Sequence, residues 1–126
     1  MQDMTVVTEA TLFEKLGGRQ AIQAVVEEFY NRVLADSDLN GFFADVNMER
    51  QKQQLARFLT AALDGPNEYD GRPMKEAHQG LGITDHHFDL VAGHLVGTLQ
   101  WAGVSQVMID EVVALVGPLK KQIVSV

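Results

Sequence analysis

The segment RQAIQAVVEEFYNRVLA, residues 19–35, decides the fold class, because its apolar residues recur three and four positions apart. That spacing places them on one face of an α-helix, whereas the residues on one face of a strand recur every second position. The apolar positions are Ile22, Val25, Val26, Phe29, Tyr30 and Val33. The segment therefore predicts a long amphipathic helix with Tyr30 on its inward face.

The same spacing continues on both sides of this segment. A capping-box pattern at residues 11–14 opens a very short helix, and two glycines at 17–18 close it. A tight turn is expected over 39–43, and Asn47 is a plausible N-cap for a helix that runs to about residue 63.

The second half of the chain is also helical in pattern. A turn-rich loop over 64–73 leads to a short helix, and Thr84 or Asp85 can cap a long helix that runs through Trp101. Ser105 can cap a last helix, whose inward positions are Ile109, Val112, Val113, Val116, Leu119 and Ile123. We therefore predict an all-α fold.

The composition fits one compact domain. The chain has 126 residues, 46% of them hydrophobic, which suffices for a single core but not for two domains. We assign residues 1–10 to an N-terminal extension and residues 11–126 to the domain. A net charge of −7, from 10 basic and 17 acidic residues, argues against nucleic acid or an anionic membrane as a partner, because both favour basic patches.

Cysteine usage and hydropathy exclude further classes. The sequence has no cysteine, so disulfides, thiolate metal sites and a cysteine nucleophile are excluded. It shows no signal-peptide pattern and no run of about 18 apolar residues that would insert into a membrane. We therefore expect a cytoplasmic protein.

Residues 71–80, GRPMKEAHQG, hold a short helix between a proline that can start it and a glycine that can end it. Met74, His78 and Leu81 fall on the apolar stripe of that helix. Burying an imidazole without a hydrogen-bond partner or a metal ion costs on the order of a few kcal/mol. Two interpretations are open: His78 is a core histidine bonded to a backbone carbonyl, or it is a metal ligand.

Three polar side chains interrupt apolar helix faces. Tyr30 lies on the inward face of its helix, Gln51 on the stripe of the next helix in its first turn, and Gln54 at the edge of that stripe. The alternatives are a core tyrosine whose hydroxyl reaches the surface and a frayed first turn that exposes Gln51. With His78, however, these donors fit a haem site, where the iron takes a neutral imidazole and a diatomic ligand accepts hydrogen bonds.

Several motifs occur in order along the chain. They are FEKLGG at 13–18, FYNRVL at 29–34, FFA at 42–44, DGP at 64–66, MKEAH at 74–78 and GITDHHF at 82–88. In this ordered set the sequence resembles a group I (N-type) truncated haemoglobin of bacterial type, and the resemblance runs from about residue 12 to residue 116. It implies a two-over-two helical sandwich around a haem.

The resemblance implies a role for each matching residue. His78 matches the proximal ligand of the haem iron, Tyr30 the distal tyrosine, and Phe43 the aromatic residue that packs against the haem plane. Gln51 and Gln54 match distal positions. The apolar residues expected at the haem are Leu55, Met74, Phe88 and Val91. Four basic residues mostly form a solvated face, but one or two of them are expected to meet the haem propionates, with Arg50 first; they are Arg50, Lys52, Arg57 and Lys75.

The sequence also departs from some members of that family. Gln54 stands where members that bind the iron from both sides have a histidine, so no second iron-ligating histidine is expected. Other members carry a glutamine where this sequence has Leu55, and here the amide lies one turn earlier, at Gln51. Members with a covalent haem link use a histidine near the C-terminus, and no histidine follows His94. A non-covalent, b-type haem is therefore expected.

The remaining histidines are weaker metal candidates. His87 and His94 share a helix face, but two turns, or about 10.5 Å, separate them. One ion would need a third ligand between them, and Val91 fills that position. We expect these two and His86 to be solvated or to serve packing.

Three functions fit the sequence. The first is reversible binding of O₂ and other diatomic gases such as NO and CO, for transport, storage or sensing. The second is nitric oxide dioxygenation, which converts NO and O₂ to nitrate and needs an external reductase, because the chain has no flavin or nicotinamide motif. The third is a helical interaction module without haem.

Overall fold

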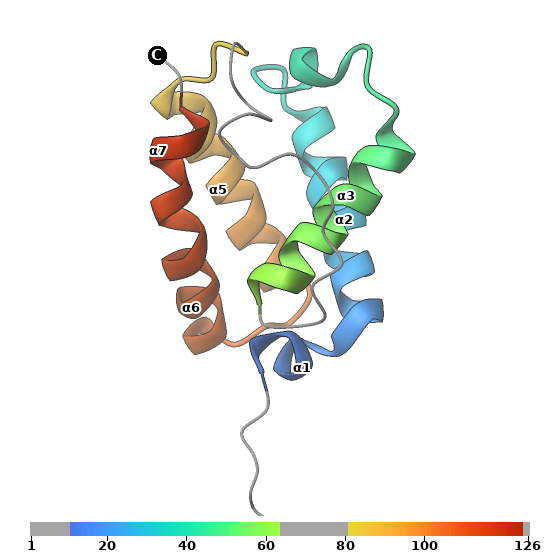
Figure 1. The fold of residues 1–126 in the computed structure, drawn as a ribbon, viewed down its shortest axis with the longest axis vertical. Helices are drawn as coiled ribbons and strands as arrows, with labels where there is room; N and C mark the ends of the chain where they lie inside the picture. The colour runs from blue at the N-terminus through green and yellow to red at the C-terminus, as the bar shows by residue number, and fades with distance from the viewer. Residues whose placement is uncertain (1–10, 64–80, 125–126) are drawn as a thin grey trace, which may run out of the picture.

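The computed structural model describes residues 11–63 and 81–124, and within these ranges all regular structure is helical (Figure 1). The helices in chain order are α1 (Leu12–Leu16), α2 (Gly18–Ala35), the 3₁₀ helix η2 (Asn40–Phe43), α3 (Met48–Ala62), α5 (Asp85–Trp101), α6 (Gln106–Val116), the 3₁₀ helix η3 (Gly117–Leu119) and α7 (Lys120–Ile123). The all-α prediction is confirmed. The predicted extension over 1–10 and the predicted helix that carries Met74 and His78 lie outside the described residues.

Two helix pairs form two layers. α2 packs against α3 in one layer, α5 packs against α6 in the other, and α2 also contacts α5 across the layers (Figure 1). The amide N–H of Phe13 donates to the carbonyl of Leu63 at 2.9 Å, which ties α1 to the end of α3. Within the described residues, no helix is both long and apolar enough to cross a membrane.

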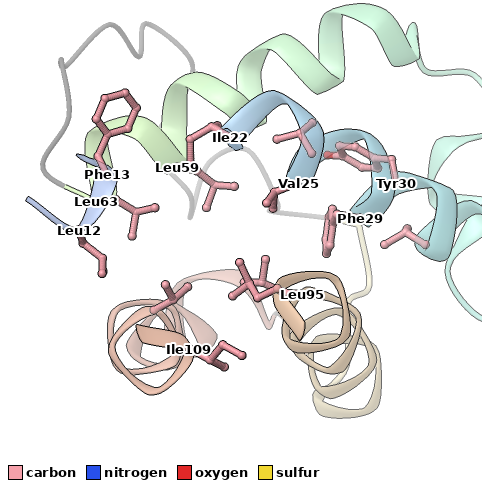
Figure 2. Close-up of a cluster of buried hydrophobic side chains, with 14 of the residues drawn as sticks. Leu12, Phe13, Ile22, Val25, Phe29, Tyr30, Leu59, Leu63, Leu95 and Ile109 are labelled. Carbon is pink, nitrogen blue, oxygen red and sulfur yellow. The ribbon is translucent and has the colours of Figure 1, made fainter. Parts of the chain in front are cut away.

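The core fills the space between the two layers (Figure 2). All six apolar positions predicted to face inward on α2 are buried. Val33 and Leu99 are 1% and 2% exposed, and burying an aliphatic side chain of this size contributes about 1.5–3 kcal/mol. The other buried core residues come from α1, α3, α5 and α6 and from the residue that follows α3; they are Leu12, Phe13, Leu59, Leu63, Leu95, Leu99, Ile109 and Val112.

Local capping sets the helix boundaries. Four N-cap side chains each accept a hydrogen bond from a backbone N–H in the first turn, as predicted; they are Thr11, Asn47, Thr84 and Ser105. Gly17 separates α1 from α2 with φ of +116°, a left-handed conformation that favours glycine. A Cβ at Gly17 would also lie 3.0 Å from the Cβ of Ala21.

The end of the chain differs from the prediction of one continuous last helix. α6 stops at Val116, and a 3₁₀ turn over 117–119 leads into α7. Pro118 has no N–H to donate to the preceding turn, so the α-helical hydrogen bonding cannot continue through it. Val113, which we predicted to face inward, is 42% exposed, whereas Ile109 and Val112 are buried as predicted.

Replacing the N-cap residue Asn47 tests how local capping supports α3. The Asn47 Oδ1 atom accepts from the backbone N–H of Arg50 at 3.2 Å. Asn47→Ala should cost about 1 kcal/mol of unfolding free energy, or about 3–5 °C in Tm, measured by thermal unfolding. Asn47→Ser, which keeps a capping oxygen, should stay near the original Tm. An alanine variant as stable as the original chain would show that packing alone fixes this helix start.

Candidate functional site

Tyr30 of α2 and Gln51 of α3 meet between their two helices. Gln51 Nε2 donates a hydrogen bond to the Tyr30 hydroxyl at 3.1 Å, across 21 positions of sequence. Tyr30 is only 3% exposed, and Gln51 is partly buried in an ordered first turn of α3. The interpretations of a surface hydroxyl and of a frayed, exposed glutamine are therefore wrong.

Burial raises the pKa of Tyr30 above its usual range, and the hydrogen bond from Gln51 offsets only part of that effect. The hydroxyl thus keeps its proton at neutral pH. Because its oxygen accepts from Gln51, its proton can be donated to another group. Tyr30 can therefore act as a buried hydrogen-bond donor.

Phe43 contacts Tyr30, and both residues were predicted to lie at the haem. It ends the 3₁₀ helix η2 and is partly buried. The rings of Tyr30 and Phe43 have centroids 5.6 Å apart and meet edge to face at 78°, a favourable aromatic geometry. Phe29 also packs edge to face against Tyr30, with centroids 5.2 Å apart. These two contacts restrain the tyrosine ring.

A polar groove of about 470 Å³ lies along α3. Its lining residues are Asn47, Glu49, Arg50, Gln53, Gln54 and Arg57. Arg50 and Arg57 are two turns apart, so they share a helix face, and the Oε1 atom of Gln54 is buried. Two guanidinium groups in one groove suit a ligand that carries carboxylates. Arg50 was the first choice for such contacts, and Arg57 was among the other basic residues considered for them.

The predicted apolar lining is only partly brought together. Leu55 and Val91 are partly buried and pack against the same core cluster that contains Tyr30. Phe88 is buried in the first turn of α5, but it lies outside that cluster of described residues, and Lys120 Nζ sits 5.8 Å from its ring centroid. His78 and Met74 fall outside the described residues, so the proximal side stays a prediction.

An ion pair beside the Tyr30–Gln51 contact was not predicted. Lys52 Nζ lies 2.7 Å from Glu27 Oε2, which joins α3 to α2 one turn before Tyr30. Neither residue interrupts an apolar face, so their spacing along the sequence gave no signal for this long-range contact.

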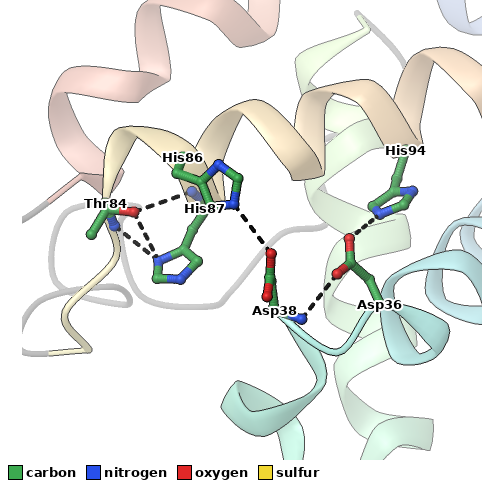
Figure 3. Close-up of polar contacts among 6 residues, drawn as sticks. All are labelled: Asp36, Asp38, Thr84, His86, His87 and His94. Carbon is green, nitrogen blue, oxygen red and sulfur yellow. Dashed lines mark hydrogen bonds and ion pairs between the residues drawn. The ribbon is translucent and has the colours of Figure 1, made fainter.

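The three histidines of α5 contact neighbouring side chains (Figure 3). His94 lies 2.8 Å from Asp36 and His86 lies 3.2 Å from Asp38, while His87 Nδ1 accepts from the backbone N–H of Thr84 at 3.1 Å. Among the described residues, no three histidine or acidic side chains gather in a way that could hold a metal ion.

Comparison with known proteins identifies the class to which this fold and site belong. A sequence model described as Bacterial-like globin matches residues 11–125. The chain belongs to the group 1 truncated haemoglobins, within that bacterial-like globin family.

Individual relatives cover most of the chain. The group 1 truncated haemoglobin GlbN of Mycolicibacterium paratuberculosis is 49% identical over 114 residues, which cover 90% of this chain and 84% of that protein. GlbN of Synechocystis is 46% identical over 112 residues, 86% of this chain and 90% of that protein.

Solved structures agree with the helical arrangement. The truncated haemoglobin of Tetrahymena pyriformis in the Fe(III) form is 38% identical, with a TM-score of 0.89 over 93% of this chain and 100% of that one. The 2/2 haemoglobin of Synechococcus sp. PCC 7002, with covalently attached haem, is 47% identical, with a TM-score of 0.84 over 90% of this chain and 95% of that one. The predicted two-over-two fold is confirmed.

The described residues fit a haem as the group that such a protein holds. Tyr30 supplies a buried donor, Phe43 supplies an aromatic edge beside it, and Arg50 with Arg57 supplies positive charge in an adjoining groove. A haem combines these needs, since it has an apolar ring, two carboxylates and a ligand that accepts hydrogen bonds.

Proposed function

We propose that this chain binds a b-type haem non-covalently and holds a diatomic ligand, with O₂ as the principal one, beside Tyr30. The observation that carries the proposal is the hydrogen bond from Gln51 Nε2 to the Tyr30 hydroxyl. It fixes the orientation of a buried hydroxyl in a protein of the truncated haemoglobin family. Haem, when bound, supplies an iron centre that takes the diatomic ligand.

The residues of this chain then select and hold the ligand. Gln51 donates to the Tyr30 oxygen and so directs the tyrosine proton away from α3 and toward the pocket. A hydrogen bond to a partly charged acceptor contributes about 1.5–3 kcal/mol, so Tyr30 favours the more polar O₂ over CO. Phe43 and Phe29 hold the tyrosine ring in place while the ligand enters and leaves.

Two further parts of the site hold the haem in this proposal. His78 supplies the proximal imidazole, and Arg50 with Arg57 pairs with the propionates from the groove along α3. Non-covalent attachment is supported by the sequence, in which no histidine follows His94. The Synechococcus relative, in contrast, has a covalently attached haem.

Nitric oxide dioxygenation remains the alternative function at the same residues. It requires an external reductase, because the sequence contains no flavin or nicotinamide motif. Rapid mixing of the oxygenated protein with NO distinguishes the two: stoichiometric nitrate with sustained turnover under a reductase indicates the enzyme, whereas a single turnover favours O₂ binding.

The optical spectrum tests the proposed coordination. Since position 54 is a glutamine, the deoxygenated ferrous protein should be five-coordinate, with a broad Soret band that sharpens and shifts when CO is added. A sharp six-coordinate low-spin spectrum without added ligand would show that another side chain reaches the iron. A colourless protein after reconstitution with haemin would refute haem binding altogether.

A further inference from the structure

Two histidines of α5, His86 and His94, reach toward the end of α2 and the segment that follows it (Figure 3). His94 Nε2 lies 2.8 Å from Asp36 Oδ2, and His86 Nε2 lies 3.2 Å from Asp38 Oδ2. The His87 ring packs edge to face on Phe42, with centroids 5.0 Å apart at 83°. Three side-chain contacts therefore hold residues 36–42 against α5.

The segment over 36–42 leads directly into Phe43, which lies at the candidate haem site. Asp36 is the C-cap residue of α2, and its Oδ1 accepts from the backbone N–H of Asp38 at 3.0 Å. Leu39 then enters the core at 2% exposure, and η2 carries Phe43 against Tyr30. The side chain of Asp36 thus joins α2, α5 and the turn that sets the position of Phe43.

The two histidine–aspartate pairs differ in burial. In the His94–Asp36 pair the side chains are 25% and 18% exposed, whereas in the His86–Asp38 pair they are 66% and 57% exposed. Water screens the second pair far more than the first, and exposed ion pairs contribute little to stability. The His94–Asp36 pair is therefore the one that can stabilise the position of the segment over 36–42.

Charge and hydrogen bonding favour the ionised form of Asp36. The hydrogen bond from His94, followed by that from the backbone of Asp38, holds the pKa of Asp36 below its usual range, and the charges of His94 and His86 add to this effect. A carboxylate at Asp36 is therefore present throughout the range in which histidine ordinarily changes its charge.

Most other charged side chains on the helices around the His94–Asp36 pair have partners of their own. On α2, Arg32 forms an ion pair with Glu28 at 2.8 Å, and its guanidinium lies beside Gly97, one turn after His94. From α7, Lys120 lies 3.3 Å from Asp89 and 3.7 Å from Asp85 on α5. On α6, Asp110 accepts from the side chain of Gln106 at 2.8 Å, and Glu111 is exposed.

We propose that Asp36 and His94 are positioning residues for Phe43, and that their contact holds the segment over 36–42 against α5. The contact geometry stands independently of the proposed function, and its consequence for haem rests on that function. A hydrogen bond to a carboxylate is about twice as strong as one between neutral groups. Loss of either partner should therefore loosen the segment that carries Phe43.

The first experiment is a double-mutant cycle on the full haem-free chain, followed by thermal unfolding at neutral pH. Asp36→Asn and His94→Gln should each lower Tm by about 3–5 °C. The double variant should lose clearly less than the sum, because both changes remove one contact. Losses that simply add in the double variant overturn the proposal.

Asp38→Asn is the matched control, because it removes a carboxylate that pairs with an exposed histidine of the same helix. It should change Tm by less than about 1 °C. If Asp36→Asn does not fold, His94→Gln alone must lower Tm by more than His86→Gln, which removes the exposed histidine of the same helix. An equal loss in these two variants then overturns the proposal.

The second experiment measures the position of Phe43 directly. In the haem-free protein at pH 6, the nuclear Overhauser effect between the Tyr30 and Phe43 rings should weaken in Asp36→Asn and persist in Asp38→Asn. An unchanged effect in Asp36→Asn refutes the positioning role whether or not the protein binds haem. In haem-loaded protein, Asp36→Asn should release haem to apomyoglobin about threefold faster at pH 6, and an unchanged rate overturns the link to the haem.

Discussion

Replacing Tyr30 by phenylalanine is expected to speed O₂ release about ten- to a hundredfold. The change removes only the hydroxyl, while the ring keeps its contacts with Phe29 and Phe43. A hydrogen bond to a partly charged acceptor contributes about 1.5–3 kcal/mol, which corresponds to this range of rates. The measurement is O₂ dissociation by stopped-flow displacement with CO.

The O₂/CO contrast is the control for this prediction. Bound CO is less polar, so its dissociation should respond far less to Tyr30→Phe, whereas a change in pocket shape would affect both ligands. Gln51→Ala should have a smaller effect on O₂ release, because it leaves the tyrosine proton in place and removes only its orienting partner. If Gln51→Ala speeds release and Tyr30→Phe does not, the principal donor is the amide.

Replacing His78 by glycine is expected to abolish tight haem binding. His78 is the residue that the sequence predicts on the proximal side of the iron. Removing a group that only supports a metal ligand costs about ten- to a hundredfold in affinity, so loss of the ligand itself should exceed that range. Haemin titration followed at the Soret band gives the affinity, and added imidazole should restore part of it.

A second histidine variant tests whether the loss of haem binding is specific to His78. His86→Ala removes an exposed histidine that pairs with Asp38, and it should leave the haem spectrum unchanged. Normal spectra for His78→Gly would show that the proximal ligand lies elsewhere in the chain.

The sequence predicted the helices well because their signals are local. Three-four spacing located α2 and α5 to within a residue, and Asn47, Thr84 and Ser105 were recognised as caps from residue type and position alone. The break at Pro118 carried an equally local signal, but the regular apolar pattern on both sides of it outweighed that signal in the prediction.

Long-range polar contacts were predicted only where a polar residue interrupted an apolar face. Tyr30 and Gln51 did so and were placed in one pocket, and the structure joins them. Asp36 and His94 lie 58 positions apart, at a helix end and on a helix flank where charged residues are common. Nothing in their spacing identifies them as partners, because their contact depends on how α2 crosses α5.

The Tyr30–Gln51 hydrogen bond also bears on the energetics of ligand capture. The Tyr30 hydroxyl is oriented before any ligand arrives. Gln51 on α3 donates to its oxygen, and the rings of Phe29 and Phe43 pack against the tyrosine ring. Reorganisation of the site on binding is then small, as in preorganised electrostatic sites generally. If Tyr30 holds the ligand as proposed, it should therefore act mainly on the time for which the ligand stays bound.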